Sequence, residues 1–484
     1  MVKRPIRTAQ RRGRTEGARR NSNPSLSPLA DPAGVRESRP DAVLIETPPS
    51  LWERAICVVI IAMMTGALIG PVFAPLQEET PVLRLVWLPA YAAIFGMALY
   101  RIDRLWRAWP AAIAVVLLVG LAFASRYWSI DFATTSRRVI ALAISGVFAL
   151  YLGAVFRGPH LPRLLMHTAL LMAVGSLVMV FAFPEIGVHQ YDNAGLWRGL
   201  WYEKNQMGAV MVIGATASAA CLASPDPRRL LPAIALALSS GLVLATQSKT
   251  SLLCLGVGLA MVAGFWSLRR GGAAFSVVAI WCAVVVAGLG VWTWETHSVA
   301  VLEALGKDPS LTGRTEIWDA LMRKVADKPW TGYGYGAFWG RAGESVPADW
   351  VRKETQWPVP NAHNGWIDLL VQLGWPGAIL VGTLMAATTL VTLLRSMGQG
   401  VREGWWALGF LAAFFVLSLS ESILLAHQGL PWVLFMAVLT RAVLPAPAPG
   451  AVPLVEKRRR AYQTGSRIAA QYPHGPVRRP PFAV

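Results

Sequence analysis

The sequence predicts an all-α polytopic membrane protein with about 12 transmembrane helices and one large periplasmic loop that contains short helices. Two observations lead to this fold class. The chain is 54% hydrophobic and 15% charged, with a mean hydropathy of +0.45, which leaves too little polar surface for a soluble domain. Apolar runs of about 20 residues, the length that crosses the hydrocarbon core of a bilayer, also recur along the chain. Each run must be helical, because a helix satisfies its own backbone groups within lipid.

The apolar runs set the organisation of the chain. They lie at about 55–76, 82–100, 108–125, 138–156, 164–183, 206–223, 229–246, 251–268, 273–293, 375–394, 405–420 and 424–443. Because the first run follows a long polar tail, it is not a cleavable signal peptide. We therefore expect a transmembrane domain at 55–443 with a large polar loop at 294–361. Pro-, Ser- and Arg-rich tails at 1–54 and 444–484 are expected to be disordered.

Most of the net charge of +18 lies in these tails. Residues 1–54 carry 11 Lys/Arg against 6 Asp/Glu, and residues 441–484 carry 8 against 1. Basic runs beside membrane spans are typical of segments attracted to anionic lipid headgroups, so we expect membrane lipids and no nucleic acid as partners. The cysteines all lie in predicted spans without Cys-x-x-Cys spacing, which predicts neither disulfides nor a zinc site.

The loop charges predict that both termini are cytoplasmic. With this orientation, every short loop on the inside is basic, as the positive-inside rule requires: 101–108, 157–163, 224–229, 269–272 and 395–404. The large loop is nearly balanced in charge and is expected to face the periplasm or the cell exterior. Arg137 and Arg138 lie on the outer side, as an exception to the pattern.

Four polar clusters fall on the predicted outer side: Arg198–Asn205, Gln247–Ser251, Thr312–Trp318 and Asn361–Asn364. Ionisable groups at the ends of spans cost free energy, which makes each cluster a candidate site. The alternative for each is snorkelling of long side chains or ordinary solvation of a loop.

Arg314 begins an amphipathic helix, because Ile317, Trp318, Leu321, Met322 and Val325 recur at helical spacing before Lys328-Pro329 ends the pattern. An Arg in the first turn of a helix suits an anion, since free N–H groups and the helix dipole add to its charge. The alternative is a surface Arg paired with Glu316 or Asp319. The glycines of Gly332-Tyr333-Gly334-Tyr335-Gly336 permit tight turns and close approach of a ligand.

His363 starts an apolar run that is too long for one crossing. Gly374 and Pro376 predict a break, so we expect a short helix at the membrane surface and then the tenth span. An imidazole there suits a general base, although a lone His is more often structural. At helical spacing Asp368 lies about 140° from His363, which argues against a dyad.

Together these clusters resemble the O-antigen ligase and O-antigen polymerase superfamily of bacterial inner-membrane proteins. His363-Asn364, nine residues and Gly374-Trp375-Pro376-Gly377 match its His-Asn-x9-Gly-x-x-Gly signature. The segments Gly313–Trp318 and Pro329–Gly336 resemble its central loop, and Tyr202–Asn205 resembles its element before a span. Lys249 and the residues after it take the place of the ligases' Arg-x3-Leu. The resemblance covers about residues 195–395.

The resemblance implies a metal-independent, inverting glycosyltransferase that needs no cofactor and whose donor is a glycan on undecaprenyl pyrophosphate. Fixed cations beside a departing diphosphate lower such a barrier. Arg314 and Lys249 are expected to hold the pyrophosphate, and His363 to take the proton of the acceptor hydroxyl. Lys204 and Arg198 are further anion-binding candidates, and Asn364 is expected to orient the imidazole or the sugar.

The acceptor stays open among three possibilities: another lipid-linked repeat unit in a polymerase, lipid A core in a ligase, or a secreted protein in a protein glycosyltransferase. Lys249 departs from the ligase pattern, because Lys presents a point charge and not a planar fork. This favours an exopolysaccharide or O-antigen polymerase, with a chain-length regulator as a possible partner. A polysaccharide flippase is the non-enzymatic alternative. It is disfavoured because internal repeats and charged mid-membrane spans are not evident.

Overall fold

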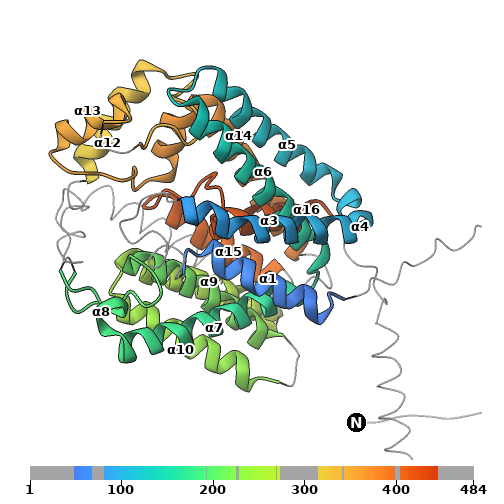
Figure 1. The fold of residues 1–484 in the computed structure, drawn as a ribbon. Coiled ribbons are helices and arrows are strands. Elements are labelled where there is room, and N and C mark those ends of the chain that lie inside the picture. Colours follow the sequence, from blue (N-terminus) through green and yellow to red (C-terminus); the bar gives the residue numbers. More distant parts are fainter. Residues whose placement is uncertain are drawn as a thin grey trace, which may run out of the picture. The chain divides into compact units, whose positions relative to one another are not determined.

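The computed structural model describes residues 48–67, 81–191, 193–224, 228–268, 270–272, 314–340, 343–397 and 404–444. These residues form helices joined by turns, with an isolated antiparallel bridge between Val188 and Trp197 (Figure 1). A helix at Lys249–Leu268 accompanies the labelled ones, which are α1 (Leu51–Met64), α3 (Pro81–Tyr100), α4 (Ile102–Arg107), α5 (Trp109–Ala124), α6 (Phe132–Val155), α7 (His160–Ala182), α8 (Pro184–Gly187), α9 (Lys204–Ala223), α10 (Leu230–Thr246), α12 (Arg314–Asp327), α13 (Val346–Thr355), α14 (Gly365–Met397), α15 (Gly404–Ser418) and α16 (Leu430–Val443).

The helices have the length and composition of membrane spans. Within the described ranges, six are long and apolar enough to cross a bilayer: Trp109–Tyr127, Phe132–Val155, His160–Ala182, Lys204–Ala223, Lys249–Leu268 and Gly365–Ser396. Shorter apolar helices lie at Leu85–Tyr100, Leu230–Thr246, Trp405–Ser418 and Leu430–Val443. This confirms an all-helical polytopic membrane protein. The predicted span at 273–293, the end of the first predicted span and residues 1–47 and 445–484 of the predicted tails lie outside the described residues. The last residues of the predicted N-terminal tail are not disordered, because α1 begins at Leu51 with Ser50 as its N-cap.

Large apolar side chains project outward from these helices. Phe95 on α3, Val116 on α5 and Leu394 on α14 are more than 60% exposed. Apolar surface of this kind is unfavourable in water but matches lipid, since hydrocarbon tails are as apolar as the side chains. The outer surfaces therefore agree with membrane embedding.

Two apolar cores meet at α15. One core draws mainly on α1, α3, α5, α6, α14 and α16, and the other on α7, α9, α10 and Lys249–Leu268. Phe410 and Phe414 of α15 belong to the first core, whereas Ala413 and Leu417 belong to the second. The turns that follow α15 therefore emerge where the two cores join.

α14 is broken at Gly374, as the sequence predicts. Gly374 has φ 64° and ψ −164°, which lie outside the helical region, and Pro376 follows it. A Cβ at Gly374 would lie 2.5 Å from the carbonyl oxygen of Pro329. The Trp375 N–H donates to that same carbonyl oxygen at 2.8 Å. The break thus lets the loop after α12 approach the α14 backbone.

The glycine-rich segment Gly332–Gly336 belongs to the loop after α12 and also contacts α14. The backbone N–H groups of Tyr333 and Gly334 donate to carbonyls of the α14 residues Val371 and Gln372, at 2.8 and 3.0 Å. Cβ atoms at its glycines would collide with the Gln372 backbone, with Ser129 and with Arg138. The close approach that these glycines allow in the structure is therefore to the protein's own helices.

The last predicted span starts later than expected. The apolar sequence predicts a helix from about 424, but α16 begins at Leu430 with Pro431 in its first turn. Leu425 and Gln428 have positive φ angles of 53° and 59°, which a right-handed helix excludes. Tyr335 donates to the Leu425 carbonyl oxygen at 2.7 Å and so holds this irregular connection in place.

Replacing Gly374 with Ala is expected to destabilise the protein by about 1–3 kcal/mol, because Ala would have to adopt a left-handed conformation. The added Cβ would also collide with Pro329 and Trp330. Thermal unfolding of the full-length chain in detergent measures the effect.

Gly382→Ala is the matched control on the same helix. A Cβ there would make only ordinary contacts of 3.6 and 3.7 Å with the Trp366 ring, and Ala favours a helix by up to about 1 kcal/mol. Equal unfolding temperatures for the two variants would contradict the role assigned to Gly374.

Candidate active site

Glu421 lies at the centre of the polar cluster that follows α15. Its Oε1 accepts a hydrogen bond from Asn205 Nδ2 of α9 at 3.3 Å and lies 3.9 Å from Arg314 Nη2 of α12. Its Oε2 lies 4.0 Å from His363 Nδ1. Burial raises the pKa of Glu421, while the Arg314 charge and the Asn205 hydrogen bond lower it. One carboxylate therefore connects residues from three distant parts of the chain.

Arg314 is the first residue of α12, as predicted. Its Nη1 donates to the Ser420 carbonyl oxygen at 2.9 Å, and its ion-pair partner is Glu421. The alternative pairing with Glu316 or Asp319 on the same helix is therefore replaced by contacts with the α15–α16 connection. The guanidinium is about one-fifth exposed, so it retains access to a ligand.

His363 lies beside this pair, immediately before α14. Its side chain is 20% exposed, and its ring stacks on that of Trp357 with 6.1 Å between ring centroids and 10° between planes. Burial, with the Arg314 charge as the second cause, lowers the pKa of His363 to about 4. The imidazole is therefore neutral at physiological pH and able to accept a proton.

Backbone contacts hold His363 and Arg314 next to each other. Trp318, one turn after Arg314, donates from Nε1 to the Ala362 carbonyl oxygen at 2.9 Å. The Asn361 side chain accepts from the His363 N–H at 2.9 Å and thereby supports the positive φ of 47° at His363. These contacts fix α12 against the segment that carries the imidazole.

Asn364 has a structural contact of its own. Its Oδ1 accepts from the N–H groups of Trp366 and Ile367 at 2.9 and 3.2 Å, which is the geometry of a helix N-cap. Asp368 is turned to other partners: its oxygens accept from Trp339 Nε1 and Gln372 Nε2. Asp368 and His363 do not form a dyad, as predicted.

Lys204 and Lys249 are the first residues of two helices, the first of which also carries Asn205. Lys204 is the first residue of α9, and Lys249 is the first residue of its own helix, with Ser251 in its first turn. A Cβ at Gly208 would lie 2.2 Å from Ser251 Oγ, so these helix ends pack closely. The two ammonium groups are near enough for their charges to interact.

Arg198 is not brought into this cluster by any contact in the described structure. Its guanidinium donates to the carbonyl oxygens of Ile186 and Glu185 at 2.8 and 3.2 Å, in the short helix α8. Cations near the last carbonyls of a helix stabilise its C-terminal end. The contacts of Arg198 are thus those of a residue that holds the α8 turn.

Several cationic residues of this region lie where helices begin. Lys204, Lys249 and Arg314 each open a helix, and His363 directly precedes the Asn364 cap of α14. The helix dipole adds partial positive charge at such ends. An anion placed among them would be attracted by fixed dipoles as well as by side chains.

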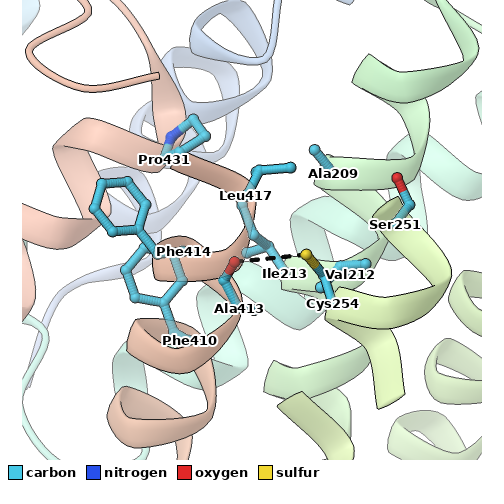
Figure 2. Close-up of a pocket in the computed structure, with 10 residues that line it drawn as sticks. All are labelled: Ala209, Val212, Ile213, Ser251, Cys254, Phe410, Ala413, Phe414, Leu417 and Pro431. Carbon is cyan, nitrogen blue, oxygen red and sulfur yellow. Dashed lines mark hydrogen bonds between the residues drawn. The ribbon is translucent and has the colours of Figure 1, made fainter. Parts of the chain in front are cut away.

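A small apolar pocket adjoins the cluster one helical turn away (Figure 2). Residues of α9, Lys249–Leu268, α15 and α16 line it: Ala209, Val212, Ile213, Ser251, Cys254, Phe410, Ala413, Phe414, Leu417 and Pro431. Leu417 accepts the Glu421 N–H through its carbonyl oxygen, and Ala209 lies four residues after Asn205. The polar cluster and the apolar pocket therefore lie on successive turns of α9 and at the C-terminal end of α15.

Glu421 is the residue of this cluster that the sequence motifs did not single out. A carboxylate between Ser420 and Ser422, flanked by two apolar runs, was the available signal, because ionisable groups beside spans cost free energy. Its partners are far away in the chain, so the signal gives no indication of what Glu421 contacts.

Comparisons with known proteins agree with the motifs. The O-antigen ligase family model matches residues 234–382, a region that includes Lys249, Arg314 and His363. The chain is 25% identical over 261 residues to the exopolysaccharide production protein ExoQ of Rhizobium meliloti (strain 1021).

That alignment covers 50% of this chain and 59% of the relative, so the chain spans less than two thirds of the relative's length. The family predicted from the motifs is the one that the comparisons find. This chain is therefore a polytopic membrane protein that is similar to the O-antigen ligase family over residues 234–382 and to an exopolysaccharide production protein over about half of its length.

Proposed function

We propose that this protein is a glycosyltransferase of the bacterial inner membrane, active at the periplasmic face. It polymerises oligosaccharide repeat units carried on undecaprenyl pyrophosphate into exopolysaccharide or O-antigen. The observation that carries the proposal is the convergence of Arg314 and His363 on Glu421, among the first residues of helices. The positive-inside pattern of the loops supports the periplasmic orientation, with both termini in the cytoplasm.

Binding of the donor diphosphate is the first part of the mechanism. Arg314 presents a guanidinium, which grips phosphate oxygens in a bidentate manner, and Lys249 and Lys204 add point charges from neighbouring helix ends. Cations fixed where negative charge develops stabilise the departing diphosphate.

Proton removal from the acceptor is the second part. The neutral imidazole of His363 takes the proton from an acceptor hydroxyl as its oxygen attacks the anomeric carbon of the donor sugar. Attack from the face opposite the diphosphate inverts that carbon. The Arg314 charge keeps the imidazole neutral before the donor arrives. Once diphosphate neutralises Arg314, the basicity of the imidazole rises at the step that needs it.

A ligase that transfers the glycan to lipid A core is the second candidate, because the matching family model is named for O-antigen ligase. Similarity to an exopolysaccharide production protein favours polymerisation. The two differ in the product that a deletion strain lacks. Loss of a polymerase leaves single repeat units on the carrier, whereas loss of a ligase leaves assembled chains there.

His363→Ala is expected to lower glycan transfer by at least about 100-fold, because the general base is lost. Gel analysis of the surface polysaccharide and of the lipid-linked pool measures this in a deletion strain that expresses the variant. The matched control is His160→Ala at the start of α7, far along the chain from the cluster, which should restore wild-type polysaccharide. Full-length polysaccharide from His363→Ala at equal protein level would refute the proposed role.

The pH dependence of transfer should report the low pKa of His363. Because the folded free protein holds this pKa at about 4 and not at the usual 6.5, the imidazole stays neutral as the pH falls from 7 to 5. Activity should therefore be lost only as the pH falls through about 4. Initial rates at low donor concentration, which reflect kcat/KM, test this with purified protein between pH 4 and 8. An acid limb with its midpoint at 6.5 would contradict it.

Asn364 should tolerate Asp but not Ala. Asp retains the oxygen that caps α14, whereas Ala loses the cap at a cost of about 1 kcal/mol. Thermal unfolding in detergent and polysaccharide length should both stay close to wild type in Asn364→Asp. If the carboxamide itself orients the imidazole or the sugar, Asn364→Asp would fold normally and yet lose transfer.

A further inference from the structure

A buried nitrogen of His363 has no hydrogen-bond partner in the described part of the chain. Nδ1 is inaccessible to solvent, and Glu421 Oε2 lies 4.0 Å from it. Leaving a buried polar group unpaired is unfavourable, so such atoms in native structures call for an explanation. A short movement of either side chain would close the gap to a hydrogen bond. Catalytic hydrogen bonds in ligand-free proteins are often long and shorten when substrate binds.

We propose that Glu421 is the positioning residue of His363: its carboxylate takes a hydrogen bond from Nδ1–H, which leaves Nε2 as the nitrogen that accepts the acceptor's proton. The inference rests on the proposed function and adds to it a residue outside the family-matched region 234–382. The histidine tautomer is set by the hydrogen bond at one ring nitrogen, so a fixed carboxylate beside Nδ1 selects the useful form.

The proposed step balances in atoms and charge. The acceptor oxygen forms a bond to the anomeric carbon, and the bond from that carbon to the diphosphate oxygen breaks, with its electron pair leaving on the diphosphate. The proton of the acceptor hydroxyl moves to Nε2 and converts His363 to an imidazolium. Glu421 stabilises this cation across Nδ1–H and does not itself take the proton.

The geometry around His363 favours this role over a purely structural one. Stacking on Trp357 fixes the ring plane, and the positive φ at residue 363 is supported by Asn361. Backbone strain of this kind in a residue other than glycine is often found at functional sites. The other nearby carboxylate on α14, Asp368, already accepts hydrogen bonds from Trp339 and Gln372.

Several charged groups act on this pair and enter its pH dependence. Arg314 of α12 faces both His363 and Glu421. Glu203, which precedes α9, and the Cys254 thiol of Lys249–Leu268 interact electrostatically with Glu421. Lys204 interacts electrostatically with Lys249 and with Glu203.

The test compares Glu421→Gln with Glu421→Asp and Glu316→Gln in the full-length protein. The Gln variant keeps a similar shape but loses the negative charge, and Asp keeps the charge on a shorter side chain. Glu316 is an exposed carboxylate two residues after Arg314 and serves as the matched control. The probe is the pool of lipid-linked repeat units extracted from the deletion strain, and kcat, KM and the pH profile of kcat are measured for each protein.

Glu421→Gln should lower kcat by about 10- to 100-fold, as expected for a group that supports a general base, without raising KM for the lipid-linked donor. The acid limb of its kcat profile should move to lower pH, because the imidazolium loses a neighbouring negative charge. Glu421→Asp should recover part of the rate, and Glu316→Gln should match wild type. A residue with only a structural role would raise KM and lower the unfolding temperature, and it would leave the acid limb in place.

Two results would overturn the inference. One is a Glu421→Gln protein with wild-type kcat and pH profile; the other is a loss of activity in Glu421→Gln that comes with a raised KM and an unmoved acid limb. His363→Ala separates this failure from failure of the proposed function. If His363→Ala is inactive and Glu421→Gln is normal, only the role of Glu421 is wrong. If His363→Ala is fully active, the proposed function is wrong as well.

Discussion

Glu421 follows α15, where two apolar cores meet, and its carboxylate is paired with Asn205 of α9, Arg314 of α12 and His363 beside α14. An unpaired buried charge is strongly unfavourable, whereas a paired one is tolerated. The elements that carry Asn205, Arg314 and His363 therefore pack against the α15–α16 connection. The same requirement that stabilises this connection also gathers the groups that the proposed chemistry needs.

The loop after α12 is fastened to α14 mainly by backbone groups. The break at Gly374 and the glycines of 332–336 let the two chains approach, and N–H groups of the loop use carbonyls that the interrupted helix leaves free. Arg138, which departs from the positive-inside pattern, donates to the carbonyl oxygen of Gly336. Arg138 thus makes a structural contact that helps to hold this loop.

Much of the fold follows from the sequence, because hydropathy and helical periodicity are local properties. The spans, the amphipathic helix at Arg314 and the break at Gly374 were predicted from a few neighbouring residues each. The late start of α16 was missed, since apolar content conceals the positive φ angles of Leu425 and Gln428. The packing of Gly332–Gly336 and the contacts of Arg198 and Glu421 depend on segments far away in the chain, which no local pattern specifies.

Under the proposed function, the residues gathered at Glu421 act on the departing diphosphate and on the proton of the attacking hydroxyl. Cations at helix ends favour a diphosphate, and an imidazole accepts a proton from any hydroxyl that is suitably placed. None of these groups distinguishes a sugar hydroxyl on a repeat unit from one on lipid A core. Under the proposed function, the same arrangement therefore serves transfer to either acceptor. Choice of acceptor must then depend on surfaces outside the Arg314–Glu421–His363 arrangement.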